Sequence, residues 1–245
     1  GIWIAQSDAK RRGQDPELYL DFALYAIICS IVGARIYYVI FEWDYYKENL
    51  LQIFNLRAGG LAIYGGVIAG AITMIVYTRV KKVSFFSMAD TGVLGLVTGQ
   101  IIGRWGNFFN CEAFGGYTDS LLAMRIRRAL VNDNMLNADV LNHRIVENGV
   151  EYIQVHPTFF YESCWNLCLL LFMLWFRRYK KYDGQMLWIY LFGYGIGRFW
   201  IESLRTDQLI LFGTGLPVSQ ALSLVLILVA AGNLIWRGYR HRQKT

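Results

Sequence analysis

The stretch that decides the fold is PVSQALSLVLILVAAGNLIW, residues 217–236, which contains no Asp, Glu, Lys or Arg. An α-helix rises about 1.5 Å per residue, so about 20 residues cross a hydrocarbon core about 30 Å thick. Helices of soluble proteins usually carry a polar stripe, and this stretch has almost none. It therefore predicts a transmembrane helix.

Other stretches have a similar length and few charges: residues 18–41, 61–78, 86–106, 159–176 and 185–204. The opening residues, GIWIAQSDAKRRG, resemble the end of a further span followed by a basic loop. Without an initiator Met we expect part of that span to be missing, and a signal peptide would place its basic residues before the apolar stretch. The sequence predicts an all-α, polytopic integral membrane protein of seven transmembrane helices, the first incomplete, forming a single domain over residues 1–245.

The distribution of basic residues predicts the orientation in the membrane. More than half of the 24 Lys and Arg fall in alternate connections. These residues are Lys10, Arg11, Arg12, Arg79, Lys81, Lys82, Arg177, Arg178, Lys180, Lys181, Arg237, Arg240, Arg242 and Lys244. The positive-inside rule makes these connections cytoplasmic, so the N-terminus lies outside and the C-terminus inside. The net charge of +6 reflects this bias and anionic lipid, and we expect no nucleic-acid partner.

Residues 110–155 form the one segment with a soluble character. Apolar and polar residues alternate in LLAMRIRRAL (121–130) and RIVENGVEYIQV (144–155), which predicts short strands. The segment is too small for an independent enzyme domain, so we predict an extracytoplasmic cap. Only Cys111 of the four cysteines lies outside the predicted spans, and no metal cluster or nucleotide motif is visible, so we predict neither a disulfide nor a cofactor.

Four arginines remain in or at the outer ends of the predicted spans: Arg35, Arg104, Arg198 and Arg205. A mid-membrane arginine costs about 2.5–3.5 kcal/mol on insertion scales, so it normally faces the bundle interior or water and has a partner. The alternative is that the long stem carries the charge back to the interface. For Arg35 and Arg205, near helix ends, both structural pairing and this alternative stay open.

The span that ends at Arg104 carries two stripes. Glycines recur at every fourth position from 95 to 103, a pattern that lets a neighbouring helix approach closely. Gln100, Arg104 and Asn107 form a polar stripe on another face, as in the wall of a cavity. The turn NFFNCEAFGG (107–116) follows, and its glycines are able to adopt left-handed dihedrals and bring backbone N–H groups near a ligand.

The span at 185–204 repeats this arrangement with Tyr194, Arg198, Glu202 and Arg205 on one face. Glu202 can pair with both arginines, and a purely structural ladder would explain Glu202 and Arg205. Arg198 lies roughly 9 Å below the outer helix end, and Arg104 is at a similar or shallower depth. Guanidinium groups bind phosphate oxygens bidentately, so the spacing predicts an outer-leaflet phospholipid site. Other polar residues that can join it are Tyr64, Asp90, His156, Tyr161 and Glu162.

GRWGNFFNCEAFG (103–115) resembles the signature of bacterial prolipoprotein diacylglyceryl transferases. GARIYYVIF, AIYGGVIAG, the span with Asp90, HPTFFYES and GYGIGRFWIESLRTD occur in the order of that family, over nearly the whole chain. The resemblance implies transfer of the diacylglyceryl group from phosphatidylglycerol to the lipobox cysteine of a prolipoprotein signal peptide. It also implies a bacterial cytoplasmic membrane, with the active site facing the outer leaflet, and no cofactor.

By this resemblance Arg104 and Arg198 are the essential arginines of the family and Tyr194 their partner tyrosine. With Tyr64 these are the residues that we predict to be catalytic. The predicted substrate-binding residues are Arg104, Asn107, Glu112, Gly115, Gly65, Gly66, Glu202, Arg205 and His156.

One departure from the family concerns the thiol proton. Many members have a histidine before the Gly-Gly pair at 65–66, where this chain has Tyr64. An unperturbed Tyr has a pKa of about 10 and is a poor base near neutral pH. Tyr64 is therefore activated by an arginine, or it only orients the headgroup, or another group such as His156 takes the proton. A positive site can also supply the thiolate without a dedicated base, since a thiol has a pKa of about 8.5.

The alternative from another class is an outer-leaflet transporter or flippase of anionic lipid. It would need polar residues that continue towards the cytoplasmic side. The inner halves of 159–176 and 217–236 are apolar, which disfavours such a path. A non-catalytic scaffold would leave both arginine stripes unexplained.

Overall fold

A computed structural model describes residues 1–208, 210 and 215–243 of the chain, and most of them are helical. Among these residues, five helices are long and apolar enough to cross a membrane. They are α2 (Glu17–Phe41), α4 (Ile63–Val80), α5 (Phe85–Phe109), α7 (Thr158–Phe176, continued by η5, Arg177–Tyr179) and α9 (Val218–Arg242). The protein is therefore an integral membrane protein, as predicted.

Two predicted spans do not reach this standard. The helix at the predicted span 185–204, α8 (Gln185–Glu202), has 18 residues but is less apolar, because Arg198 and Glu202 occupy its last turns. The first helix, α1 (Ile2–Arg11), has only 10 residues. Five of the seven predicted spans are thus found as apolar helices of spanning length.

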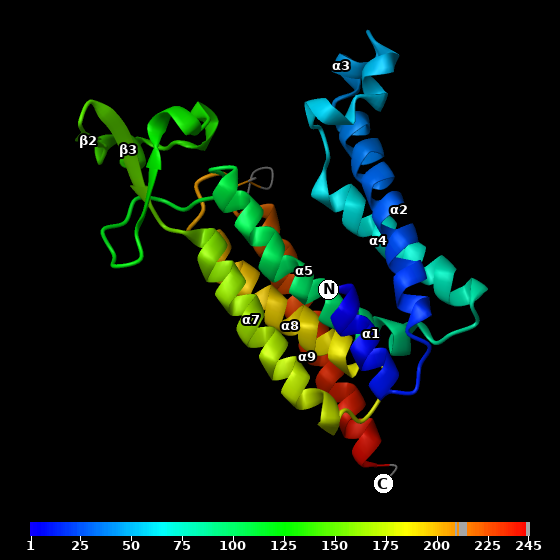
Figure 1. Cartoon of the computed structure of the whole chain (residues 1–245). Coiled ribbons are helices and arrows are strands. Elements are labelled where there is room, and N and C mark those ends of the chain that lie inside the picture. Colours follow the sequence, from blue (N-terminus) through cyan, green and yellow to red (C-terminus); the bar gives the residue numbers. More distant parts are fainter. Residues whose placement is uncertain (209, 211–214, 244–245) are drawn as a thin grey trace. The chain divides into compact units, whose positions relative to one another are not determined.

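The chain forms two compact units, Ile2–Gly92 and Val93 to the C-terminus with Gly1, which are described separately. In the N-terminal unit α2 packs along α4, the two blue and cyan helices of Figure 1. The packing is close because a Cβ on Gly65 would lie 2.4 Å from the carbonyl oxygen of Gly33. Small residues at a helix contact let the two backbones approach.

Arg35 organises the connection between α2 and α4, which holds α3 (Trp43–Tyr46), η1 (Leu50–Phe54) and η2 (Leu56–Ala58). Its guanidinium is buried and donates to five backbone carbonyls at 2.6–3.2 Å. The acceptors belong to Gln52, Ile53, Asn55, Gly59 and Gly60. All five donors of the side chain are therefore used, and of the two possibilities left open for Arg35 the structure shows structural pairing.

The start of α5 belongs to the N-terminal unit and is held by polar contacts. Arg12 donates to the Thr91 hydroxyl at 2.8 Å, and that hydroxyl lies 3.1 Å from the Asp8 carboxylate. Asp90, named above as a possible member of the site, is buried in this unit with 1% of its surface exposed.

In the C-terminal unit α7, α8 and α9 lie side by side (Figure 1). The Trp165 indole on α7 donates to the Gly193 carbonyl on α8 at 2.9 Å. A Cβ on Gly195 would lie 2.9 Å from Ile227 on α9, so small residues set this contact as well. The predicted packing through the glycine stripe of α5 is not found at Gly99 or Gly103, where a Cβ would meet no described atom within 4 Å.

The predicted strands are confirmed in the segment that joins α5 to α7. The strands β1 (Met124–Arg127), β2 (Ile145–Glu147) and β3 (Val150–Val155) form an antiparallel sheet in the order β1-β3-β2. Between β1 and β2 lie η3 (Arg128–Leu130), η4 (Asp133–Met135) and α6 (Ala138–Asn142). Ile126 and Ile153 pair across the sheet and enter a small core with Phe114.

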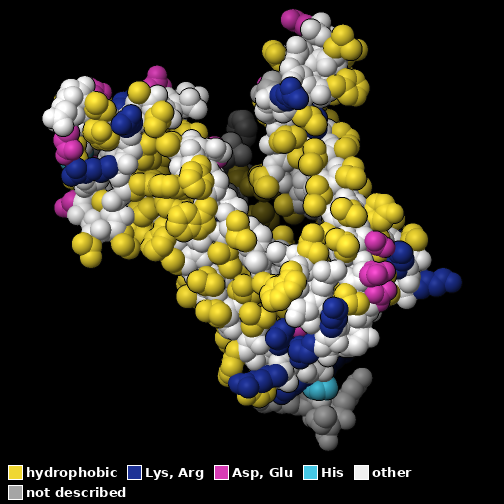
Figure 2. Space-filling view, viewed as in Figure 1, with side chains coloured by type: hydrophobic (Ala, Val, Ile, Leu, Met, Phe, Trp, Pro, Cys, Tyr) yellow, Lys and Arg dark blue, Asp and Glu magenta, His cyan; other side chains and the backbone are white. Residues whose placement is uncertain are grey.

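Large apolar side chains are exposed on the long helices. Examples are Leu24 and Ile28 on α2, Phe172 on α7, and Val225 and Leu228 on α9. Figure 2 shows hydrophobic side chains over much of each unit. A soluble protein seldom exposes so much apolar surface to water, whereas the hydrocarbon core of a lipid bilayer accommodates such a surface.

Candidate active site

Arg104 and Arg198 converge on one carboxylate. Arg104 lies in the last turns of α5 and its Nη2 is 2.8 Å from Oε1 of Glu162. Arg198, on α8, places Nη1 at 3.6 Å from the other oxygen, Oε2. Glu162 is on α7 and is 4% exposed, so three helices meet at one buried anion. The two guanidinium groups are therefore spaced to hold a single anionic group between them.

A second carboxylate extends this cluster along α8. Arg198 Nη2 lies 2.6 Å from Glu202 Oε2, the i, i+4 pair that the sequence predicted. Glu202 is 3% exposed, whereas the side chains of Arg104 and Arg198 keep 23% and 16% of their surface. Two positive and two negative groups thus alternate, which limits the cost of placing charges inside a membrane protein.

The end of α5 supports Arg104 through the signature turn. Arg104 Nη1 donates to Asn107 Oδ1 at 3.4 Å, and Asn107 Nδ2 donates to Glu112 Oε1 at 3.1 Å. Asn110 Nδ2 donates to the same carboxylate oxygen at 3.1 Å. Asn107 and Glu112 therefore form a chain of hydrogen bonds that braces the arginine.

The glycines of this turn do not adopt left-handed dihedrals. The left-handed residues are Cys111 and Ala113, with φ of 53° and 54°. Gly115 is required for space instead, because its Cβ would lie 2.7 Å from both the Leu204 carbonyl oxygen and the His156 Cβ. Its N–H donates to the His156 carbonyl at 2.9 Å. Gly115 therefore joins the turn to the segments before α7 and after α8, and the left-handed dihedrals that its glycines could adopt are found at Cys111 and Ala113 instead.

Arg205 follows α8 and forms a structural pair. Its Nε and Nη2 donate to the two carboxylate oxygens of Asp207 at 2.8 and 2.6 Å. Burial alone would lower the pKa of Arg205, but the hydrogen bond and charge of Asp207 raise it overall. Burial likewise opposes the Asp207 charge, yet Arg205 holds the pKa of that carboxyl below its usual value. The close pair of Arg205 is therefore with Asp207 rather than with Glu202.

Two stacked tyrosines lie on α8 next to the arginine cluster. The rings of Tyr190 and Tyr194 are 5.6 Å apart and inclined by 21°. Gln100, one turn before Arg104 on α5, donates to the Tyr190 hydroxyl at 2.8 Å. Tyr194 is thus adjacent to Arg198 on its own helix, as the spacing predicted, while Tyr190 ties α8 to α5.

His156 precedes α7 at the junction with Gly115. Its Nδ1 lies 3.3 Å from the Tyr161 hydroxyl, and its backbone N–H donates to the Gly116 carbonyl at 3.0 Å. Burial lowers the pKa of His156 below its ordinary value of 6.5. The imidazole is therefore largely neutral at neutral pH.

Tyr64, Gly65 and Gly66 begin α4 and belong to the N-terminal unit. Gly65 is buried against α2, and a Cβ on Gly66 would lie 3.4 Å from the Ser30 carbonyl oxygen. The close contact between α2 and α4 is thus sufficient to explain why position 65 is a glycine.

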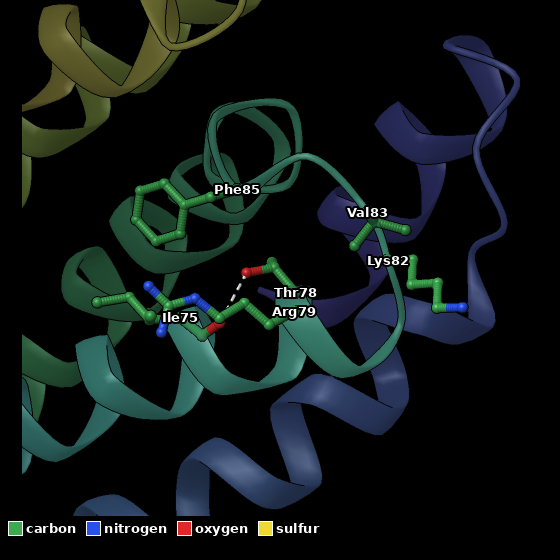
Figure 3. Close-up of a pocket in the computed structure, with 6 residues that line it drawn as sticks. All are labelled: Ile75, Thr78, Arg79, Lys82, Val83 and Phe85. Carbon is green, nitrogen blue, oxygen red and sulfur yellow. Dashed lines mark hydrogen bonds between the residues drawn. The ribbon is translucent and has the colours of Figure 1, made fainter.

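The N-terminal unit also has an open hollow of about 540 Å³, drawn in Figure 3. It is lined by Ile75, Thr78, Arg79, Lys82, Val83 and Phe85, and contains none of the predicted site residues. Its cations, Arg79 and Lys82, belong to the basic connection between α4 and α5. We assign this hollow no part in the site.

Glu162 is the residue whose importance the sequence did not establish. HPTFFYES suggested it only as a possible companion, because a sequence does not tell which of several acidic residues meets two arginines from other helices. The available signal was its place inside an apolar span, where a carboxylate needs a partner.

Comparisons with known proteins show the family of this chain. A family model described as Prolipoprotein diacylglyceryl transferase matches residues 1–236. The chain is 44% identical over 225 residues to the phosphatidylglycerol–prolipoprotein diacylglyceryl transferase of Clostridioides difficile (strain 630). The alignment covers 92% of this chain and 80% of that protein. The enzyme of the same name from Geobacillus kaustophilus (strain HTA426) is 40% identical over 230 residues, with 94% and 80% covered. The chain belongs to the prolipoprotein diacylglyceryl transferase family.

Proposed function

We propose that this protein transfers the diacylglyceryl group of phosphatidylglycerol to the lipobox cysteine of a prolipoprotein. The observation that carries the proposal is the convergence of Arg104 and Arg198 on opposite oxygens of one buried carboxylate, at 2.8 and 3.6 Å. A lipid phosphate offers the same arrangement of anionic oxygens. The names of the relatives favour this activity over lipid transport.

The reaction is alkyl transfer at a glycerol carbon. The cysteine sulfur forms a C–S bond to the terminal carbon of the diacylglyceryl group, and the bond from that carbon to the phosphate oxygen breaks. Its electron pair stays on glycerol phosphate, and the released phosphate monoester can carry the proton lost by the thiol. Charge therefore develops on the departing phosphate, and fixed positive groups in a site of low dielectric stabilise it.

The arrangement suggests a role for each residue. Arg104 and Arg198 hold the phosphate, which replaces the Glu162 carboxylate as the partner of their guanidinium groups. Asn107 and Glu112 keep Arg104 in place through the hydrogen bonds described above. We retain Tyr194 and Tyr64 as the other predicted catalytic residues.

Further predicted residues have supporting roles. Gly65, Gly66, Gly115, Glu202 and Arg205 stay in the proposed substrate site, the first three with clear packing contacts as well. A neutral His156 can accept a proton, so it remains a candidate for the group that takes the thiol proton.

The basic connections support an orientation with the N-terminal side outside and the C-terminus inside. In this orientation the segment at 110–155 caps the extracytoplasmic side of a cytoplasmic membrane. The turn at 107–116 and the arginine pair then face the outer leaflet, where the lipobox cysteine of a prolipoprotein is presented.

The test is reconstitution of the purified protein with phosphatidylglycerol and a lipobox peptide. We expect a mass gain of one diacylglyceryl unit on the peptide. Arg104→Ala and Arg198→Ala should each lower the rate by about 100-fold or more, the loss typical of one oxyanion-binding donor. Arg125→Ala, which removes an exposed arginine of the β-sheet, is the control. Transfer at the native rate by the double variant would refute the proposal.

A further inference from the structure

A layer of buried amides lies one helical turn from the arginine pair. Asn166 on α7 is fully buried, and neither Oδ1 nor Nδ2 has a hydrogen-bond partner among the described residues. Gln100 on α5 has an unpartnered buried Oε1, again counting only the described residues, while its Nε2 donates to Tyr190. Buried polar groups are normally satisfied, so two such amides indicate a ligand.

Contacts between α5 and α7 place the two amides at one level. The ion pair of Glu162 with Arg104 fixes the register of the two helices, and the Ser163 hydroxyl donates to the backbone of α5 at 3.0 Å. The helices run in opposite directions (Figure 1). The four residues from Glu162 to Asn166 therefore lead the same way as the four from Arg104 back to Gln100.

The third wall of this layer is α8. Trp165, next to Asn166, donates to the Gly193 carbonyl at 2.9 Å. Gly193 precedes Tyr194, which stacks on Tyr190. The two amides and the two tyrosines thus form a polar layer, called the amide layer here, between α5, α7 and α8.

The amide layer matches a group that both donates and accepts hydrogen bonds. The Nδ2 of Asn166 donates, whereas Oδ1 of Asn166 and Oε1 of Gln100 accept. Neighbouring hydroxyl groups satisfy both kinds of partner. Four residues of helix place the layer about 6 Å from the arginines along the axis, a distance that the few bonds between a phosphate and its attached glycerol can cover.

We propose that Asn166 and Gln100 bind the hydroxyl groups of the headgroup glycerol while Arg104 and Arg198 hold the phosphate. This inference rests on the proposed function, because it assigns the part of the lipid that leaves as glycerol phosphate. The amide layer then selects phosphatidylglycerol over phospholipids without headgroup hydroxyls. A site built to bond hydroxyl groups rejects analogues that lack them, since its own polar groups are left unpaired.

The test compares two soluble headgroup mimics, glycerol 1-phosphate and propyl phosphate, on the purified full chain. Calorimetry should give the native protein a dissociation constant about 10- to 100-fold lower for glycerol 1-phosphate. In Asn166→Leu the dissociation constants of the two mimics should differ by no more than about 2-fold. The reason is that binding of glycerol 1-phosphate weakens and binding of propyl phosphate does not. Asn233→Leu makes the same change on α9 and should keep the native ratio.

Thermal unfolding without ligand separates binding from structure. Leu matches the shape of Asn and removes unsatisfied polar atoms, so Asn166→Leu should not lower the unfolding temperature. Asn166→Ala is the second variant if Leu does not fit.

Three results would overturn the inference. They are a native ratio near one, a native ratio retained in both Asn166 variants, and a clear loss of stability in both. Transfer to a lipobox peptide by the native chain tests the proposed function separately, so the two failures are distinguishable.

Discussion

Glu162→Gln tests the central geometry most directly. The change keeps the shape of the side chain and removes the negative charge that two arginines share. Removing one partner of a fully buried ion pair costs about 3–5 kcal/mol. Arg104 keeps 23% of its side-chain surface and Arg198 retains Glu202, so we expect a smaller loss, about 2–3 kcal/mol.

This loss corresponds to an unfolding temperature lower by about 4–12 °C for a chain of this size. The assay is thermal unfolding in detergent, followed by tryptophan fluorescence, with and without glycerol 1-phosphate. Glycerol 1-phosphate should stabilise the variant more than the native protein, because in the variant its phosphate no longer competes with the Glu162 carboxylate for the two arginines.

Glu147→Gln is the matched control. Glu147 contacts Arg125 at the same distance, 2.8 Å, but 55% of its side chain is exposed. Exposed pairs contribute about 0–1 kcal/mol, so this variant should unfold almost as the native protein does. Equal unfolding temperatures for Glu162→Gln and the native chain, with equal stabilisation by the anion, would refute the bridging role.

Three further predictions concern the turn at 107–116, the pH dependence of stability and the segment at 50–60. Gly115→Ala should lower stability by about 1–3 kcal/mol through overpacking, whereas Gly116→Ala should be tolerated because its Cβ would meet no described atom within 4 Å; thermal unfolding of both variants measures this. Because burial lowers the pKa of His156, its contribution to stability is full above pH 6.5 and declines as the pH falls through the folded-state pKa; His156→Asn should remove this part of the pH dependence of unfolding. Arg35→Lys supplies three donors for five carbonyls, so limited proteolysis should cut residues 50–60 faster than in the native protein.

Much of the fold follows from the sequence, because hydrophobic length is a strong signal in a membrane protein. The stretch at 217–236 and four others appear as apolar helices of spanning length. The alternation at 121–130 and 144–155 likewise became an antiparallel sheet. Of the two predicted spans that fall short, α1 has only 10 residues, and α8 is less apolar because Arg198 and Glu202 lower its hydropathy.

The candidate site was only partly predictable. The spacing in each helix predicted the pair of Arg198 and Glu202, because both partners lie on one face of one helix. The bridge through Glu162 joins three helices, and no local pattern specifies such a contact. The left-handed backbone of Cys111 and Ala113 was also unpredictable, since neither residue favours it without tertiary constraint.

The arrangement around Arg35 has a consequence for biogenesis. Five carbonyls of residues 52–60 accept hydrogen bonds from one side chain of α2, and that of Gln52 also accepts one from the Asn55 N–H at the end of η1. Apart from its two short helices, the order of this segment therefore depends on α2. Its order reports that α2 is in place, which makes protection of this short segment from proteases a natural measure of correct insertion during synthesis.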